Sequence, residues 1–314
     1  MSRVAAIDCG TNSIRLLITD LPDGPDPAGS GPAAKRDVRR ELRIVRLGHR
    51  VDATGRLDDA ALQRTFEACS EYAQMIAEAG AERIRFCATS ATRDASNAQV
   101  FIDGVRDRLG VLPEVLTGDT EAALSYTGVV RELPRVADPV LVVDLGGGST
   151  ELVTGTGGEV QAAQSLELGS VRLSERHLHS DPPTPAEIDA CAADAEQILA
   201  GSRVPLSTVR TAVGVAGSVT TIAAHALDLE SYDPQRIHHA RIGFEQLRSS
   251  CAAILGASVA ERRRMPFMDP GRADVIGAGA VIVQRILAHL DSADPVLMVS
   301  EHDILDGIAL SVQT

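Results

Sequence analysis

Two stretches of the chain share one order of apolar, acidic, glycine and hydroxyl residues. The first covers residues 4–13, where an apolar run ends at Asp8 and leads into a short loop with one glycine. The second covers residues 142–151, where an apolar run reaches Asp144 and leads into three consecutive glycines and two hydroxyl residues. Because a strand-like apolar pattern resumes after each loop, both stretches predict a β-hairpin. The repetition predicts a duplicated architecture.

The loops of these hairpins have the composition of a phosphate-binding site. Glycine permits positive φ and removes the Cβ atoms that would keep a ligand away. Successive exposed N–H groups then form a concave site for anionic oxygens. The neighbouring acids would repel a bare phosphate, which favours a divalent cation between carboxylate and phosphate. The alternative is a glycine-rich hairpin that binds no ligand.

Two common phosphate-binding motifs do not fit. The dinucleotide fingerprint and the Walker loop both lead from a strand into a helix, and the Walker loop also requires a lysine. Neither loop opens a long helical pattern, and the only lysine of the chain, Lys35, is far from both. The two hairpins therefore predict phosphate held between two halves of a duplicated protein.

Hydrophobic periodicity predicts alternating strands and helices along the whole chain. Turn-forming residues over 21–34 predict an exposed loop, and Thr184 is placed to cap a helix. The expected strands are 3–8, 14–19, 41–47, 84–88, one near 115, 140–144, 150–154, 160–166, 209–215 and 295–299. The expected helices are 58–78, 95–109, 119–131, 169–179, 185–200, 218–227, 244–255, 258–264, 272–290 and 303–311.

Length and composition predict a two-domain cytoplasmic protein. A chain of 314 residues exceeds one ordinary core. The net charge of −13 argues against general binding of nucleic acid or anionic membranes, and any polyanionic substrate needs a local basic patch. The five cysteines form no CxxC pair, which is typical of a reducing compartment. Neither a leader pattern nor an apolar run of membrane length is visible.

Seven sequence elements, in order, resemble the exopolyphosphatase and guanosine pentaphosphate phosphohydrolase (Ppx/GppA) family of the actin-like ATPase superfamily. They occupy residues 6–13, 89–97, 118–122, 144–151, 214–218, 272–280 and 299–307. The resemblance implies an α/β fold of two ribonuclease-H-like domains around a central cleft, paired into a homodimer. We expect the first domain over residues 1–123 and the second over 124–314. The last helix, at 303–314, would pack back on the first domain.

The resemblance also implies an activity. Family members hydrolyse terminal phosphoanhydride bonds with Mg²⁺ and water. We therefore expect an exopolyphosphatase that releases orthophosphate from inorganic polyphosphate, using Mg²⁺ or Mn²⁺ and a monovalent cation such as K⁺. Larger members carry further helical domains, so we expect a preference for short chains. Two alternatives stay open: hydrolysis of guanosine pentaphosphate (pppGpp to ppGpp), and non-catalytic binding of polyphosphate or ppGpp. Neither nucleic acid nor a membrane is an expected partner.

Individual residues take roles from the same resemblance. Glu121 is similar to the family's catalytic glutamate, which would activate water for in-line attack. Asp144 is the favoured metal ligand, with Asp8 and Glu151 as further candidates; the alternative is that these acids only shape their strand ends. The residues expected to bind phosphate oxygens are Thr11, Asn12, Ser13, Arg93, Gly146, Gly147, Gly148, Ser149, Gly217 and Ser218. Where the family has paired glycines this chain has Ala216 before Gly217, which weakens the expectation of close approach by a nucleotide.

The histidines show no spacing typical of a metal site. His238 and His239 lack carboxylate or cysteine partners at ligand spacing. We expect their side chains to be solvated.

Overall fold

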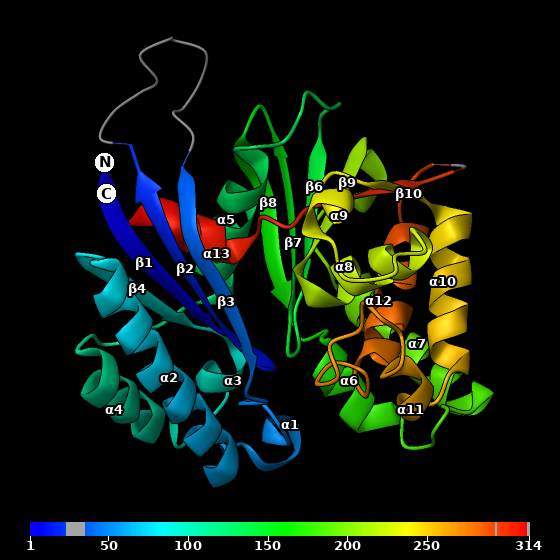
Figure 1. Ribbon diagram of the computed structural model, residues 1–314. Coiled ribbons are helices and arrows are strands. Elements are labelled where there is room, and N and C mark those ends of the chain that lie inside the picture. The colour runs from blue at the N-terminus through cyan, green and yellow to red at the C-terminus, as the bar shows by residue number, and fades with distance from the viewer. Residues whose placement is uncertain (23–34, 293, 313–314) are drawn as a thin grey trace. The chain divides into compact units, whose positions relative to one another are not determined.

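The computed structural model describes residues 1–22, 35–292 and 294–312 (Figure 1). Most of the loop expected over residues 21–34 lies outside these ranges. Within them, no helix is long and apolar enough to cross a membrane.

Contacts divide the chain into two compact units. Unit 1 comprises the chain up to Thr117 and the segment from Ile304 onward, and unit 2 runs from Gly118 to Asp303. The limit expected at residue 123 would leave Glu121 in the first domain, whereas the contacts assign it to unit 2.

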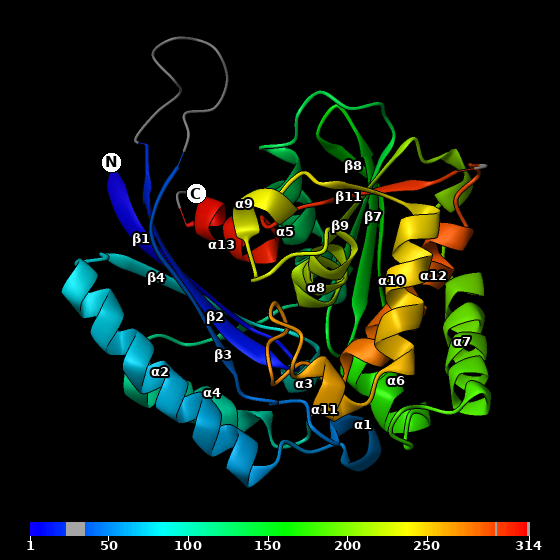
Figure 2. The ribbon, with the colours of Figure 1, turned by 45° about the vertical axis from the view of Figure 1, so that its right-hand side comes forward.

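Unit 1 contains a mixed sheet with the strand order β3-β2-β1-β4-β5 (Figure 1). Its strands are β1 (Ser2–Cys9), β2 (Ser13–Leu21), β3 (Arg36–Ile44), β4 (Arg83–Ala88) and β5 (Glu114–Val115). Its helices are α1 (Val51–Thr54), α2 (Asp59–Ala79), α3 (Ser90–Arg93), α4 (Ala98–Leu109) and α13 (Ile304–Ser311). The first three strands pair antiparallel, and β4 and β5 continue the sheet in parallel with β1. Helices α2 and α4 lie on one face, and α13 packs against β1 and β2 on the other (Figures 1 and 2).

Unit 2 repeats this arrangement in the order β10-β11-β9-β6-β7-β8. Its strands are β6 (Val140–Leu145), β7 (Thr150–Thr156), β8 (Glu159–Leu166), β9 (Thr211–Val215), β10 (Arg241–Gly243) and β11 (Val296–Val299). Its helices are α5 (Gly118–Val130), α6 (Ser170–His177), α7 (Pro185–Ala200), α8 (Ala216–Ala226), α9 (Pro234–Ile237), α10 (Phe244–Gly256), α11 (Val259–Arg262) and α12 (Ile276–Ala288). Strands β8, β7, β6, β9 and β11 follow one another across this sheet in the same relative directions as β3, β2, β1, β4 and β5 in unit 1. The prediction of two ribonuclease-H-like α/β domains is therefore confirmed.

Capping interactions fix the ends of helices α2 and α7, whose bounds the sequence predicted well. The Asp58 carboxylate accepts from two N–H groups in the first turn of α2, and Gly80 ends that helix with φ 67°. Thr184 and Glu187 form a capping box at the start of α7. These interactions lie within a few residues along the chain, so the sequence alone predicts them.

Other boundaries were wrong. Strand β3 begins at Arg36 rather than near residue 41, because its first half is charged and exposed at the sheet edge, where burial imposes no apolar pattern. The helix expected over 95–109 begins only at Ala98, after the separate short helix α3. The short elements α1, α9 and β10 were not predicted.

Candidate active site

A glycine hairpin between β6 and β7 forms the centre of the candidate site in unit 2. Asp144 on β6 lies directly across from Glu151 on β7. The turn closes where the Gly146 N–H donates to the Ser149 carbonyl at 3.0 Å. The predicted hairpin is confirmed, and its register places two acids side by side at the start of the loop.

The start of α6 holds this loop from one side. The Gly147 carbonyl accepts from the N–H groups of Val171 and Arg172 at 2.8 and 3.1 Å, and the Arg172 guanidinium donates to the Gly148 carbonyl at 2.8 Å. A Cβ atom on Gly169 would lie 2.2 Å from the Gly147 carbonyl oxygen, so only glycine permits this approach. Within the described chain, the N–H groups of Gly147 and Gly148 donate to no protein group, which leaves both for an anionic ligand.

Glu151 interacts with two other buried carboxylates of unit 2, Glu121 and Asp144. Glu121, Asp144 and Glu151 are 6%, 6% and 2% exposed. Ser125 donates to Asp144 Oδ2 at 2.6 Å, and Ser165 donates to Glu151 Oε1 at 2.7 Å. Burial raises the pKa of Glu151 well above its usual value, and the negative charges of Glu121 and Asp144 raise it further. The site therefore brings three acidic side chains together where little solvent reaches them.

Two glycines bring Glu121 to this group. A Cβ atom on Gly118, at the start of α5, would lie 2.5 Å from the Ser165 Cβ on β8. A Cβ atom on Gly155 of β7 would lie 2.1 Å from the Tyr126 hydroxyl further along α5. The helix thus packs tightly across β7 and β8, which fixes its first turn, with Glu121, beside the hairpin.

The oxygen donors of the carboxylate group suit a hard divalent cation. Both charged groups that act on Glu151 are acidic, so a cation would relieve the repulsion that raises its pKa. Among the described residues, no group of three or more His, Cys, Asp or Glu side chains is arranged to hold a metal ion by itself. Mg²⁺ needs no such group, because it usually takes one or two carboxylates and completes its shell with water and phosphate oxygens. Asp144 and Glu151 fit that requirement.

The matching hairpin of unit 1 has a different charge balance. Asp8 on β1 lies across from Arg15 on β2, the register that Asp144 and Glu151 occupy in unit 2. Asp8 Oδ2 accepts from Arg15 Nη2 at 2.6 Å and from Nε at 3.0 Å. Arginine thus neutralises Asp8, which makes it a weaker candidate for a metal ligand than Asp144.

The loop of this first hairpin is closed in the same way as the second. The Gly10 N–H donates to the Ser13 carbonyl at 2.9 Å. The Thr11 hydroxyl lies 2.9 Å from the Ser90 hydroxyl, and both side chains are buried. Thr11, Asn12 and Ser13 therefore form one short turn within unit 1, as the predicted phosphate loop requires.

Arg93 and Gly217 lie in settings that the sequence did not reveal. Arg93 ends α3, is exposed, and donates from Nη1 to the Leu116 carbonyl at 2.9 Å. The Arg272 guanidinium donates to the Gly217 carbonyl at 2.9 Å, and a Cβ on Gly217 would lie 2.1 Å from Arg272 Nη2. Ala216 has a φ of 66°, a region that glycine favours. A guanidinium, rather than open backbone, lies against this turn, next to Ser218 at the start of α8.

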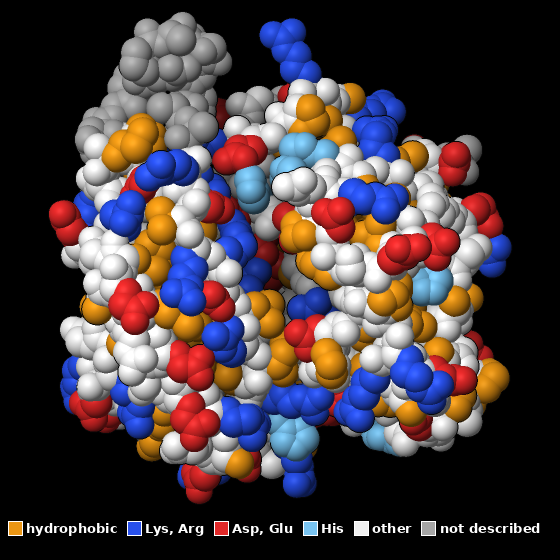
Figure 3. All heavy atoms as spheres, viewed as in Figure 1, with side chains coloured by type: hydrophobic (Ala, Val, Ile, Leu, Met, Phe, Trp, Pro, Cys, Tyr) orange, Lys and Arg blue, Asp and Glu red, His pale blue; other side chains and the backbone are white. Residues whose placement is uncertain are grey.

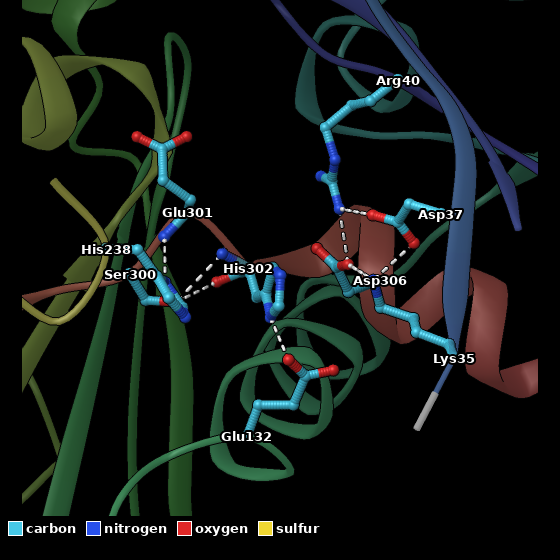
Figure 4. A network of polar contacts seen from close by, with 9 residues as sticks. All are labelled: Lys35, Asp37, Arg40, Glu132, His238, Ser300, Glu301, His302 and Asp306. Carbon is cyan, nitrogen blue, oxygen red and sulfur yellow. Dashed lines mark hydrogen bonds and ion pairs between the residues drawn. The ribbon is translucent and has the colours of Figure 1, made fainter. Parts of the chain in front are cut away.

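The expectation that His238 and His239 are solvated holds only in part, because both side chains are half-buried. Their rings stack with centroids 3.7 Å apart, and the ring of His302 lies 4.7 Å from that of His238. His302 Nδ1 is 2.9 Å from a carboxylate oxygen of Glu132 (Figure 4). Residues far apart in the sequence supply these neighbours, so spacing along the chain could not predict them.

Sequence reasoning also missed the residues that hold the carboxylates and the glycine loop. Ser125 follows Glu121 by four residues in one helix, and this spacing places both side chains on the same face, so it was a usable signal. Ser165 and Arg172 carry no comparable signal, because their partners come from β7 and its hairpin.

The chain is similar to known proteins along nearly its whole length. A family model described as the Ppx/GppA phosphatase family matches residues 30–312. Exopolyphosphatase 2 of Mycobacterium tuberculosis (strain ATCC 25618 / H37Rv) is 48% identical over 321 residues, covering 99% of each chain. A solved exopolyphosphatase-like protein is 41% identical with a TM-score of 0.92, covering 99% of this chain and 97% of its own. The solved Aquifex aeolicus member of the Ppx/GppA family is 33% identical with a TM-score of 0.80, again covering 99% and 97%.

Proposed function

Because the chain belongs to the Ppx/GppA phosphatase family, we propose that it is an exopolyphosphatase. Water would attack the terminal phosphorus of inorganic polyphosphate, the terminal anhydride bond would break, and orthophosphate would leave. The high similarity to a curated exopolyphosphatase over the whole chain supports this substrate over guanosine pentaphosphate.

The observation that carries the proposal is the position of Glu121 beside the glycine hairpin. Glu121 is buried and close enough to Glu151 to raise its pKa, and Glu151 lies on the same hairpin as the N–H groups of Gly147 and Gly148. A carboxylate beside fixed anion-binding donors suits a base that orients a water molecule toward a bound phosphoryl group. The N–H groups would stabilise the charge that develops on its oxygens.

Two residues of the unit 2 loop, Gly146 and Ser149, were expected to bind phosphate oxygens. Gly146 instead donates its N–H to the Ser149 carbonyl and would shape the loop, and Ser149 would supply a hydroxyl to phosphate. Thr11, Asn12, Ser13 and Arg93 would bind phosphate from unit 1, and Gly217 and Ser218 would bind further groups of the substrate.

We assign the divalent cation, Mg²⁺ by donor chemistry, to Asp144 and Glu151. When bound, it would neutralise phosphate charge that the acidic site would otherwise repel. Asp8, whose charge Arg15 balances, would orient the first loop instead. A monovalent cation such as K⁺ and a homodimeric state follow from the family resemblance, and a cytoplasmic location follows from composition; all three belong to the proposal.

Phosphate release tests the proposal directly. Wild type and Glu121→Gln are compared with Mg²⁺ on polyphosphates of defined length, guanosine pentaphosphate and ATP. We expect release from polyphosphate above all, and a loss of roughly 10²- to 10⁴-fold in Glu121→Gln, the usual contribution of a general base. Glu159→Gln, on an exposed residue of β8 in the same unit, is the control for the change of charge.

Three outcomes would count against this function. Faster release from guanosine pentaphosphate would favour the alternative phosphohydrolase. Tight binding of polyphosphate by wild type without any release would indicate a non-catalytic binding protein. Full activity in Glu121→Gln would remove Glu121 from the mechanism.

A further inference from the structure

The loop between β3 and α1, residues 45–50, is built directly against the first hairpin; we name it the arginine loop. The N–H groups of Val45 and Arg46 both donate to the Asn12 carbonyl, at 3.0 and 2.8 Å. The Gly48 N–H donates to the Thr11 carbonyl at 2.8 Å. Three backbone bonds therefore fix this loop to the two central residues of the predicted phosphate turn, all within unit 1.

The same loop contains backbone conformations that its residues do not favour. Arg46 and Arg50 have φ values of 54° and 56°, in the left-handed region where glycine or asparagine is usual. A Cβ on Gly48 would lie 2.3 Å from the Thr11 methyl group, so the loop lies closely against the first hairpin at this point. Unfavourable conformations of this kind are concentrated at ligand-binding segments, where surrounding contacts maintain them.

The charge of this segment is opposite to that of the chain. The arginine loop contains Arg46, His49 and Arg50 and no Asp or Glu, whereas the whole chain has 43 acidic and 30 basic residues. His49 and Arg50 are exposed, and Arg46 is half-buried. Figure 3 shows basic side chains beside a histidine on the surface where α1 lies in Figure 1. The segment is the local basic patch that a polyanion requires on an acidic protein.

We propose that Arg46 and Arg50 bind internal phosphate groups of a polyphosphate chain where it passes the first hairpin. This inference rests on the proposed function, since it identifies the part of the substrate that follows the terminal phosphate. Every internal phosphate carries a negative charge, and the guanidinium fork suits phosphate oxygens better than an ammonium does. A nucleoside in this position would present fewer charges, so the loop favours an inorganic chain.

Equilibrium binding of long-chain polyphosphate tests this assignment. Affinities are measured with Mg²⁺ in a Glu121→Gln background, so that the chain stays intact, for added Arg46→Asn and Arg50→Asn. Each variant should bind about tenfold more weakly, the loss expected for one charge-assisted contact. The slope of log affinity against log salt concentration should fall in magnitude by about one per arginine removed.

Asparagine also separates binding from folding. It tolerates the left-handed region better than arginine, so the substitution adds no backbone strain, and urea denaturation of each variant shows whether the fold is kept. Arg106→Gln removes an equal charge from a half-exposed arginine on α4 and should leave affinity and salt slope unchanged.

The inference is overturned if both asparagine variants bind polyphosphate as Arg106→Gln does, or if the parent does not bind it at all. Hydrolysis by wild type is scored separately. Binding that depends on the arginine loop, without phosphate release by wild type, would sustain this inference and refute the proposed function.

Discussion

The two hairpins share one strand register and differ in charge balance. In each, an acid at the end of the first strand faces one residue of the returning strand, Asp8 facing Arg15 in unit 1 and Asp144 facing Glu151 in unit 2. Unit 1 therefore neutralises its acid within the protein. Unit 2 places two acids together, and the Glu121 charge adds to them.

This difference shows how a duplicated element can take two roles. A balanced ion pair holds a loop in shape without a ligand, whereas a group of buried carboxylates becomes stable when a cation or a proton joins it. One position in the hairpin, occupied by arginine or by glutamate, decides between these roles.

The largest expected effect is a difference in phosphate release between a variant of Asp144 and a variant of Asp8. Asp144→Asn should lower phosphate release about 10³-fold, the size seen when one preorganised group that stabilises charge is removed. Asp8→Asn should lower it far less, because Arg15 and the turn remain. Both are measured as kcat/KM on polyphosphate across a range of Mg²⁺ concentrations. Equal losses in both, with equal rescue by Mg²⁺, would mean that Asp8 is also a metal ligand.

A second comparison concerns the glycine behind each loop. A methyl group on Gly169 would meet the Gly147 carbonyl, whereas one on Gly48 would meet the Thr11 side chain. Gly169→Ala should therefore displace the loop and lower activity about 10²-fold, as a shift near 1 Å can do. Gly48→Ala should lower stability by about 2 kcal/mol, the usual range for overpacking.

Rescue distinguishes the two cases. Thr11→Ser removes the obstructing methyl and keeps the hydroxyl beside Ser90, so it should restore much of the stability lost in Gly48→Ala. Gly243→Ala is the control, since a Cβ there would meet nothing within 4 Å. Normal activity in Gly169→Ala would show that the exact position of the loop is unimportant.

The sequence predicted what depends on neighbours along the chain. The cap at Thr184, the apolar strands and both hairpins follow from local chemistry or from alternation. The charged half of β3 could not be found, because an edge strand needs no apolar pattern. The pairing of Asp8 with Arg15 could have been predicted in part, because a short hairpin fixes which residues lie opposite each other. The sequence alone did not show which face of the sheet Arg15 occupies.

For the candidate site, the sequence offered residue roles that stay predictions, and it did not show the electrostatics. The loops and Glu121 came from motifs. The mutual repulsion of three acids, the support from Ser165 and the stacked histidines depend on the packing of distant strands and helices, which a one-dimensional pattern does not contain.

A third prediction concerns how much the Asp8–Arg15 ion pair of unit 1 contributes to the free energy of unfolding. The Asp8 and Arg15 side chains are 7% and 17% exposed, so breaking the pair leaves a poorly solvated charge. Asp8→Asn and Arg15→Gln should each lower the free energy of unfolding by about 2 kcal/mol, between the values for surface and buried pairs. The double variant should lose less than the sum in urea denaturation. Additive losses would show that the pair contributes nothing to the hairpin.

The smallest expected change is in the pH dependence conferred by Glu151. Its pKa in the folded state is raised above the ordinary value of 4.5, so between those two values the folded protein binds more protons than the unfolded chain. Stability then falls as pH rises through that window. Glu151→Gln imitates the protonated side chain, so at neutral pH without metal it should be more stable by on the order of 1 kcal/mol, with a flatter pH profile.

Mg²⁺ should raise the melting temperature of wild type more than that of Glu151→Gln, because the variant lacks one carboxylate ligand. A variant that is less stable than wild type in metal-free buffer, yet equally stabilised by Mg²⁺, would show that Glu151 is a structural acid like Asp8 and that the two hairpins do not differ in role.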